Sequence, residues 1–244
     1  MPKPYVFVYL PKTGSTPFLA HLGRQLVWNE GIVYLGAWGD RQRQRQARPD
    51  ISFWSATKLS KVRVITGDDI GMSAHSVVGA DAGRYLTVLR DPAEMAVADY
   101  NASLERGEEM PPFADWYEHR RVNQTTRRFC QLLGVGSVDK VGELLRDFWF
   151  VTTTDHLDED APHLLEHMGV EGGWSGGRDT EGDLDDVDPD DTGEIAIVGG
   201  RPIAGLELTD DIRQRVYDDN PRDLRLIKLA RKRRKSKRDK YGWS

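Results

Sequence analysis

The sequence predicts an α/β fold in which a central parallel β-sheet is flanked by helices on both faces. Short apolar runs alternate with longer segments of helical periodicity along most of the 244 residues. Strands that alternate with helices in this way pair in parallel and are covered on both faces. The first apolar run also ends in a tight, hydroxyl-rich turn that leads directly into a helix. The length is sufficient for one large α/β domain or two small ones.

Four apolar runs are expected to form strands, and segments of helical pattern lie between and after them. The expected strands are Tyr5–Leu10, Val62–Thr66, Tyr85–Leu89 and Phe148–Thr152. The expected helices are Pro17–Asn29, Pro92–Leu104, Phe113–Leu133, Val138–Arg146, Asp155–Met168, Asp210–Asn220 and Arg222–Arg233. Pro221 separates the last two helices, because proline opens a helix more readily than it continues one.

The composition indicates a water-soluble protein with a sizeable core. Charged residues make up 30% of the chain, hydrophobic residues 39%, and the mean hydropathy is -0.58. No stretch approaches the roughly 20 apolar residues that span a bilayer. The first strand begins almost at the N-terminus, without room for a secretory signal, so we expect a cytoplasmic protein. The one cysteine, Cys130, is expected to pack as a small apolar residue.

Charge is unevenly distributed, although the formal net charge is only -5. Residues 179–194 are strongly acidic, and residues 228–240 are strongly basic. We expect a solvated loop and a frayed tail, since charge runs are usually solvated. The alternative for the basic run is contact with a polyanion. No nucleic-acid-binding module accompanies it.

The domain prediction follows from these runs. Residues 1–234 are expected to form one domain, in which residues 172–194 are an acidic surface loop or lid. Residues 235–244 are expected to form a basic C-terminal tail. The polar, basic segment Arg41–Asp50 is either an exposed helical turn or a loop beside an anionic substrate. The sequence contains no internal repeat.

Residues Val6–Thr16, V-F-V-Y-L-P-K-T-G-S-T, are the most informative stretch. They read as a strand, a phosphate-sized loop and a helix N-terminus. Such a loop directs backbone N–H groups, the helix dipole and Lys12 at one anion. Thr13, Ser15 and Thr16 add hydroxyl donors, and Thr16 is also placed to cap a helix with Pro17 at its first position.

This loop departs from the Walker A pattern, in which the lysine follows the second glycine. Here Lys12 precedes the only loop glycine, Gly14. An ordinary ATP or GTP hydrolase is therefore the weaker interpretation. An incidental lysine in a plain strand–turn–helix is the alternative without a function.

A second motif, Tyr85–Tyr100, reads Y-L-T-V-L-R-D-P-A-E-M-A-V-A-D-Y. A buried strand ends in Arg90, Asp91 is placed to cap a helix, and Pro92 opens it. An arginine at the carboxyl end of a strand faces the crevice where open α/β sheets bind ligands, and its guanidinium suits a phosphate. The alternative to a phosphate-binding role is a structural pair of Arg90 with Asp91 at the start of the helix.

Together these motifs resemble the sulfotransferase family, most of all its carbohydrate-type branch that includes heparan-sulfate 2-O-sulfotransferases. Pro11–Thr16 is similar to the family's 5′-phosphosulfate loop, P-K-T-G-G-T or P-K-T-G-S-T, and V-L-R-D-P to its 3′-phosphate element. Further similar segments are Val64–Gly67 with Asp68 (I-T-G-H), Asn123–Cys130 (N-x-Q-T-R-F-L-C), Asp147–Asp160 (F-x-x-V-G-x-T-E-x-x-D-E) and the terminal helices Leu208–Leu229.

The resemblance implies a three-layer, P-loop-like α/β fold and a sulfuryl donor, 3′-phosphoadenosine 5′-phosphosulfate (PAPS), with 3′-phosphoadenosine 5′-phosphate (PAP) as product. It implies that the loop Pro11, Lys12, Thr13, Gly14, Ser15 and Thr16 holds the 5′-phosphate. Arg90 is expected to hold the 3′-phosphate. Arg127 either reaches the nucleotide or is a surface arginine. No metal is required.

Two positions depart from the family pattern. The family places a serine eight residues after the arginine, and this chain has Ala98 there. Asn101, one turn further along the helix, is expected to substitute, and Ser103 less directly. The family's I-T-G-H histidine is Asp68 here. Both departures bear on activity more than on fold.

The acceptor hydroxyl benefits from a general base. Asp68 occupies the matching position, Asp69 is adjacent, and His75 is the only histidine nearby. Each also has a structural alternative, as a turn former or as a surface or core histidine. His163 and His167 are spaced like metal ligands but read as helix-face histidines.

The sequence therefore predicts a sulfotransferase acting on a hydroxyl of a glycan or another small polar acceptor. The alternatives are an inactive homologue that still binds the nucleotide and, with less support, a P-loop-like small-molecule kinase.

Overall fold

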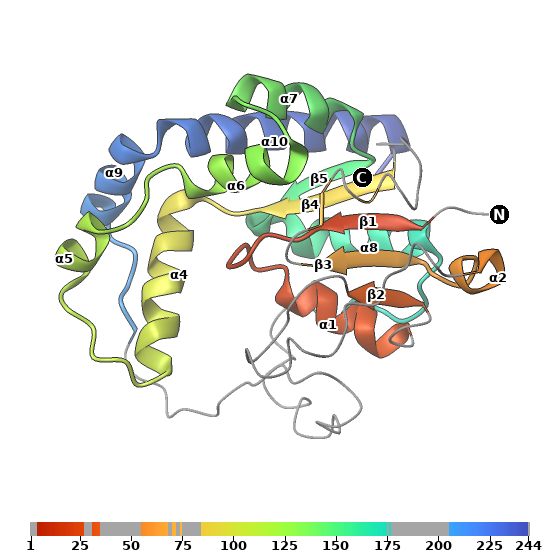
Figure 1. Cartoon of the computed structure of the whole chain (residues 1–244), viewed down its shortest axis with the longest axis horizontal. Helices are drawn as coiled ribbons and strands as arrows, with labels where there is room; N and C mark the ends of the chain where they lie inside the picture. The colour runs from red at the N-terminus through yellow and green to blue at the C-terminus, as the bar shows by residue number, and fades with distance from the viewer. Residues whose placement is uncertain are drawn as a thin grey trace.

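The computed structural model describes residues 4–26, 31–34, 55–67, 70–71, 74, 84–174, 176 and 205–243. Within these residues, five parallel strands form one sheet in the order β2-β3-β1-β4-β5 (Figure 1). Their bounds are β1 Tyr5–Val8, β2 Ile32–Tyr34, β3 Val64–Gly67, β4 Tyr85–Leu89 and β5 Phe150–Thr153. The predicted α/β class with a central parallel sheet is confirmed. The short edge strand β2 was absent from the prediction.

The helices of the described residues follow the predicted order, except that one predicted helix is divided in two. Their bounds are α1 Thr16–Gln25, α2 Ala56–Leu59, α4 Pro92–Glu105, α5 Phe113–Glu118, α6 Gln124–Leu133, α7 Val138–Asp147, the 3₁₀ helix η5 Thr154–His156, α8 Leu157–Met168, α9 Asp210–Asp219 and α10 Pro221–Tyr241. The single helix predicted over Phe113–Leu133 is wrong, because the chain breaks into α5 and α6. Asn123, just before α6, takes a left-handed conformation with φ 53°, which interrupts helical geometry.

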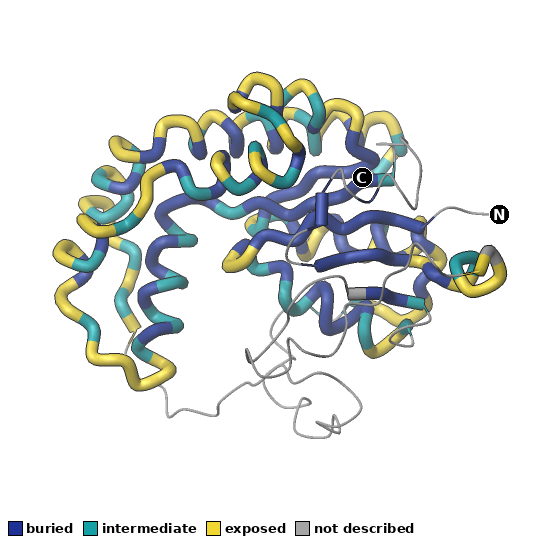
Figure 2. Tube along the Cα trace, in the orientation of Figure 1, coloured by how far each residue is buried: buried dark blue, intermediate teal, exposed yellow. Residues whose placement is uncertain are grey.

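The sheet is buried on both faces, as Figure 2 shows by the dark strands. Successive side chains of a strand point to opposite faces. Val6 and Val8 therefore join the core cluster that includes residues of α6, α7 and α10, whereas Tyr5 and Phe7 join the cluster with α1 and α8. Cys130 is half-buried against the first cluster, as expected of a small apolar residue, and burial raises the pKa of its thiol.

The expectation of a frayed basic tail is wrong. Residues 228–240 continue α10, which runs to Tyr241 and packs along the edge strand β5 (Figure 1). Its arginines face acidic residues of α8, and Asp160 accepts hydrogen bonds from Arg234 and Arg238. This segment is therefore ordered, although its composition alone indicates disorder. Ion pairs between the two helices stabilise it, and so does packing of the apolar parts of its long side chains.

A separate apolar cluster joins α4, α5 and α9 and lies beyond the carboxyl end of β4 (Figure 1). It is tied to the sheet where α6 and α10 begin, because each helix caps the other. The Asn123 side chain accepts a hydrogen bond from Arg222 N at 2.8 Å, and the Asp223 carboxylate accepts one from Thr126 N at 2.7 Å. Burial raises the pKa of Asp223, while its hydrogen bonds oppose that shift. This reciprocal capping fixes the start of α6 relative to the sheet.

Several predictions fall on residues that the structure does not describe. Arg41–Asp50 and most of the acidic loop at 172–194 lie outside the described residues, as do Asp68, Asp69 and His75. No helix among the described residues has the length and apolar character that a bilayer span requires.

Candidate functional site

The loop between β1 and α1 lies at the carboxyl edge of the sheet, after its central strand. β1 has β3 on one side and β4 on the other. The chain fills one half of the sheet with β2 and β3 and then the other half with β4 and β5, so the direction of winding changes at β1. Open α/β sheets bind ligands in the crevice at such a switch point.

The loop is folded by its own hydroxyl groups. Thr13 Oγ1 donates to Leu10 O at 2.8 Å and is 2.9 Å from Ser15 Oγ. Both side chains are only 1% exposed, so they brace the loop from inside and do not extend toward a ligand. Lys12 and Gly14 are left-handed, with φ 64° and 69°. Alternation of left- and right-handed residues turns successive N–H groups into one concavity that binds anions.

The helix after the loop begins one residue earlier than expected. α1 starts at Thr16, and Ser15 is its N-cap. The predicted capping role of Thr16 is therefore wrong. The Ser15 side chain makes no capping hydrogen bond to the helix, which leaves the N-terminal N–H groups of α1 without that partner.

Arg90 reaches the same loop from the end of β4. Its Nη1 donates to Lys12 O at 3.5 Å, and its Nε lies 3.6 Å from the Glu94 carboxylate. The Nε atom is buried and has no hydrogen-bond partner among the residues that the structure describes. The two sequence motifs, predicted separately, are thus in contact. The capping prediction is confirmed, because Asp91 accepts from Ala93 N at 2.9 Å and Pro92 opens α4.

Sequence reasoning gave no role to Thr154, which also contacts this loop. Its Oγ1 lies 2.5 Å from Thr13 O and 3.2 Å from Leu89 O. It follows β5 directly, so one hydroxyl links the chain after β1, β4 and β5. Its only signal in the sequence is the threonine of the family's V-G-x-T-E segment.

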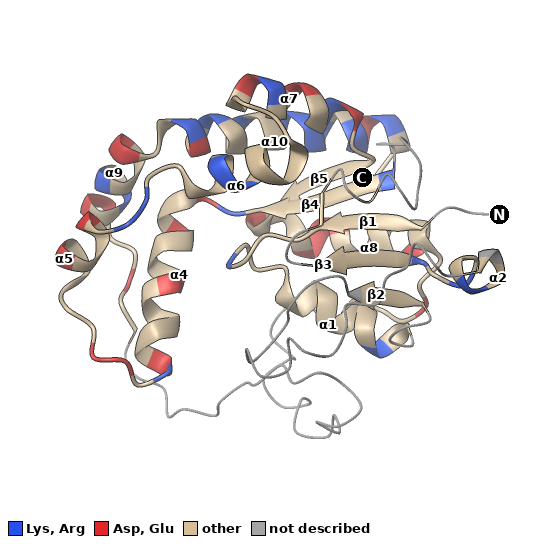
Figure 3. Ribbon diagram, in the orientation of Figure 1, with Lys and Arg blue, Asp and Glu red and all other residues tan. Residues whose placement is uncertain are grey.

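A cleft of about 480 Å³ adjoins the loop, between α4 and α6. Its lining includes one acidic and five basic side chains, namely Asp99, Lys12, Arg120, Arg121, Arg127 and Arg128. Figure 3 shows basic residues in the loop, at the end of β4 and on α6. Such a wall attracts anions.

Two of the cleft's arginines make polar contacts with other protein groups, whereas its other three cations make none with the groups that the structure describes. Arg120 pairs with Asp99 and lies over the Trp116 ring at 4.4 Å. Arg128 donates to Gln131 at 3.0 Å. The side chains of Lys12, Arg121 and Arg127 make no hydrogen bond or ion pair within the described part of the chain.

The structure brings together only part of the predicted site. Pro11, Lys12 and Arg127 line the cleft, and Arg90 contacts the loop. Asn101 is engaged elsewhere: its side chain donates to Leu206 O at 3.0 Å and accepts from Leu206 N at 2.8 Å. The amide expected to replace the missing serine hydroxyl therefore connects α4 to the segment before α9.

The remaining candidates do not form a metal centre within the described residues. No group of three or more His, Cys, Asp or Glu side chains there could hold a metal ion. His163 and His167 stack on aromatic rings, with centroid distances of 5.0 Å to Trp243 and 5.1 Å to Trp149. Ser103 accepts a hydrogen bond from Arg106 at 2.9 Å.

The fold and this site define an α/β protein with a basic cleft beside a tight loop at the carboxyl edge of its sheet. No protein-family model matches the chain, and no curated protein matches it. Among solved structures, the chain is similar to a sulfotransferase from Alicyclobacillus acidocaldarius. The TM-score is 0.45 and the sequence identity 13%, over 95% of this chain and 97% of that chain.

Proposed function

We propose that this chain is a sulfotransferase that transfers a sulfuryl group from PAPS to a hydroxyl of a glycan or another small polar acceptor. The observation that carries the proposal is the contact between Arg90 and the Lys12 loop at the ends of β4 and β1. The loop offers a cation and backbone N–H groups to one phosphate. Arg90 offers a guanidinium to another phosphate. A donor with phosphates on both ends of its ribose uses both.

The unused hydrogen-bonding capacity of the site fits such a donor. Within the described part of the chain, Arg90 Nε is buried without a hydrogen-bond partner, a costly arrangement that a phosphate oxygen would relieve. Ala98 carries no hydroxyl, and the Asn101 amide is occupied by Leu206. Arg127 and Arg121 are therefore the residues that we propose as additional ligands of the nucleotide phosphates.

We propose that the acceptor binds on the opposite side of the loop from the basic cleft. The basic cleft lies toward β4, whereas β3 borders β1 on the other side and ends at Gly67. Asp68 follows Gly67 in the sequence. We propose Asp68 as the base that accepts the proton of the acceptor hydroxyl, with His75 as its rival.

PAPS supplies a sulfuryl group attached to a phosphate that can depart. Lys12 would neutralise the charge that develops on the bridging oxygen, and the backbone N–H groups of residues 13–16 would hold the 5′-phosphate. Because Lys12 supplies this charge, the proposal requires no metal ion. In-line positioning of the acceptor oxygen completes the requirements of the reaction.

The test is calorimetric titration with PAP and with ADP. We expect PAP to bind about 10- to 100-fold more tightly, because a charge-assisted contact to the 3′-phosphate contributes about 1.5–3 kcal/mol. Arg90→Met should remove most of that preference. Arg106→Met is the matched control, since Arg106 lies on the surface and pairs with Glu108, and it should retain the preference. Equal affinities of the wild type for the two nucleotides would refute the donor assignment.

A second candidate is a homologue that binds the nucleotide without catalysing transfer. Ala98 and Asp68 at the two departing positions favour it, as does the engagement of Asn101 by Leu206. Tight PAP binding without turnover, in a screen of hydroxyl acceptors with labelled PAPS, would support this candidate. A small-molecule kinase has less support, and tighter binding of ADP than of PAP would favour it.

A further inference from the structure

We propose that Thr154 is a positioning residue for the anion-binding loop, and that it makes glycine necessary at position 14. The inference concerns the shape of the loop itself. It rests on the proposed function only where nucleotide binding is the readout.

The Thr154 hydroxyl joins segments that are far apart in the sequence. It lies 2.5 Å from Thr13 O, 141 residues away, and 3.2 Å from Leu89 O, the last residue of β4. A hydroxyl carries one hydrogen, so the shorter contact is the stronger bond and the longer one shares the proton. β4 lies between β1 and β5 in the sheet. Thr154 therefore reaches past the end of β4 to hold the loop that follows β1.

The methyl group of Thr154 fills the space beside Gly14. A Cβ placed on Gly14 would lie 2.7 Å from Thr154 Cγ2, closer than real Cβ contacts. Gly14 also has φ 69°, which disfavours other residues. Thr154 thus acts on the loop twice, through a hydrogen bond to Thr13 and through close packing against Gly14.

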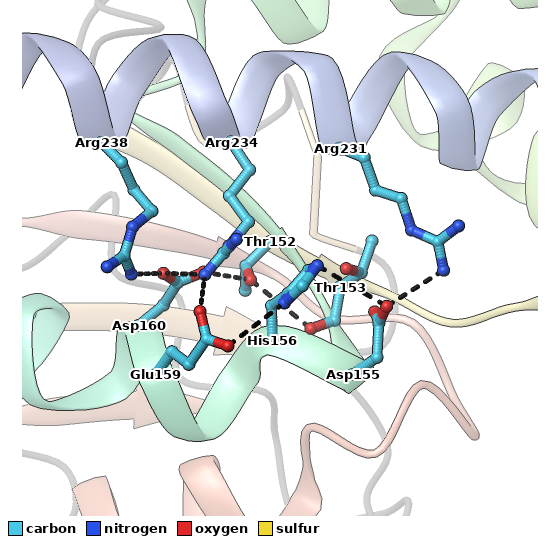
Figure 4. Close-up of polar contacts among 9 residues, drawn as sticks. All are labelled: Thr152, Thr153, Asp155, His156, Glu159, Asp160, Arg231, Arg234 and Arg238. Atoms are coloured by element: carbon cyan, nitrogen blue, oxygen red, sulfur yellow. Dashed lines mark hydrogen bonds and ion pairs between the residues drawn. The ribbon is translucent and has the colours of Figure 1, made fainter. Parts of the chain in front are cut away.

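Residues on either side of Thr154 belong to a polar network along β5, α8 and α10 (Figure 4). Next to it, Asp155 pairs with Arg231 at 3.0 Å. Two residues before it, Thr152 donates to the fully buried Asp160 at 2.5 Å. Because the buried Thr152–Asp160 contact anchors the chain two residues before it, the Thr154 hydroxyl can fix the direction of the loop N–H groups, as preorganised sites require.

The loop needs such support because its conformation is strained. Lys12 is left-handed without being glycine, a state that persists only where surrounding contacts enforce it. Without the Thr154 hydroxyl, the Lys12–Ser15 peptides would sample other orientations. Anions would then bind less tightly, because binding would have to order the loop.

The experiment compares Thr154→Val, which keeps the shape and removes the hydroxyl, with Thr154→Ser, which keeps the hydroxyl. The first readout is amide hydrogen exchange of residues 12–15 without ligand. We expect at least 10-fold faster exchange in Thr154→Val and near-normal exchange in Thr154→Ser. Thr66→Val is the matched control, since the Thr66 hydroxyl also donates to a buried backbone carbonyl, Phe7 O at 3.1 Å. It should leave exchange of the loop unchanged.

The packing half of the proposal is tested with Gly14→Ala. Alone it should accelerate loop exchange and weaken PAP binding about 10-fold or more. Addition of Thr154→Ser, which removes the methyl group that the new Cβ would meet, should restore part of both. The two substitutions should therefore be coupled, as residues in contact are.

Two outcomes would overturn the proposal: equal loop exchange in Thr154→Val and Thr66→Val, or a Gly14→Ala defect that Thr154→Ser leaves unchanged. The exchange experiment uses no nucleotide. If wild-type protein fails to bind PAP while Thr154→Val still loosens the loop, the proposed function fails and the positioning role stands.

Discussion

Replacement of Asp160 by asparagine should cost this protein about 3 kcal/mol of folding stability. Asp160 is fully buried at the junction of α8, β5 and α10 (Figure 4). Its carboxylate accepts two hydrogen bonds from Arg234, at 2.7 and 3.0 Å, one from Arg238 at 2.6 Å and one from Thr152 at 2.5 Å. Asparagine has nearly the same shape but one acceptor oxygen, and its NH₂ group would face hydrogen-bond donors.

The magnitude follows from what would be left unpaired. Breaking a buried ion pair by changing one partner costs about 3–5 kcal/mol, because the other charge stays buried. Arg234 and Arg238 retain 11% and 15% side-chain exposure, and Arg234 also contacts Glu159 at 2.5 Å. Because water partly hydrates both arginines and the Glu159 carboxylate still pairs with Arg234, we expect a loss of stability near the lower end of this range. For a chain of this size, 3 kcal/mol lowers Tm by roughly 6–12 °C.

The assay is denaturant unfolding followed by circular dichroism at pH 7, with Asp155→Asn as matched control. Asp155 is also an acidic residue that pairs with an arginine of α10, but Asp155 and Arg231 are 40% and 47% exposed. Exposed pairs contribute at most about 1 kcal/mol. A loss below about 1 kcal/mol for Asp160→Asn, or equal losses for the two variants, would refute the reasoning.

Three further predictions concern the proposed chemistry and the basic helix. Lys12→Ala should lower kcat about 100-fold or more and change PAP affinity much less, because we propose that Lys12 acts on charge that develops during transfer. A near-normal kcat with a raised KM for PAPS would show that Lys12 only binds the donor. Burial and neighbouring cations lower the pKa of Lys237 to about 8, so its charged form costs stability below that pH. Lys237→Met should raise Tm at pH 7 in thermal melts, and the difference in Tm from the wild type should shrink as pH rises from 8 toward 10.5. A difference that stays constant across that range would contradict the explanation by charge. For the general base, either Asp68→Asn or His75→Asn should flatten the acidic limb of the dependence of kcat on pH. An enzyme with an aspartate base should keep its activity down to about pH 5, whereas one with a histidine base should lose it below about pH 6.5. If the pH profile is unchanged in both variants, neither residue is the base.

The buried strands and amphipathic helices were predictable because their signals are local. β4 was predicted with its observed bounds, since its apolar run ends at a charged residue and a helix cap. β2 was missed because three residues are too short for a periodic signal. The break at Asn123 depends on tertiary contacts, since its side chain is needed to cap α10 and its own N–H donates to Asn220.

The basic end of α10 shows where composition misleads. A run of lysines and arginines normally stays solvated, because burial of unpaired charge is expensive. Here Arg234 and Arg238 meet Asp160, and Trp243 stacks on His163 with a centroid distance of 5.0 Å. The signal for order was therefore divided between two helices far apart in the sequence, and neither half is informative alone.

The residues of the candidate site that stand at strand ends were predictable, and those with distant partners were not. Lys12 and Arg90 could be found because each stands at the end of an apolar run, where the topology of a parallel sheet brings strand ends together. The contacts of Asn101 and Thr154 could not be predicted, because their partners lie far away in the sequence: the backbone of Leu206 for Asn101, and the carbonyl oxygens of Thr13 and Leu89 for Thr154. A polar side chain near a site can bind a ligand or support the backbone that does so, and its sequence neighbours are similar in both cases. In this protein the amide expected to bind a ligand supports the backbone, and a threonine without an assigned role sets the shape of the loop.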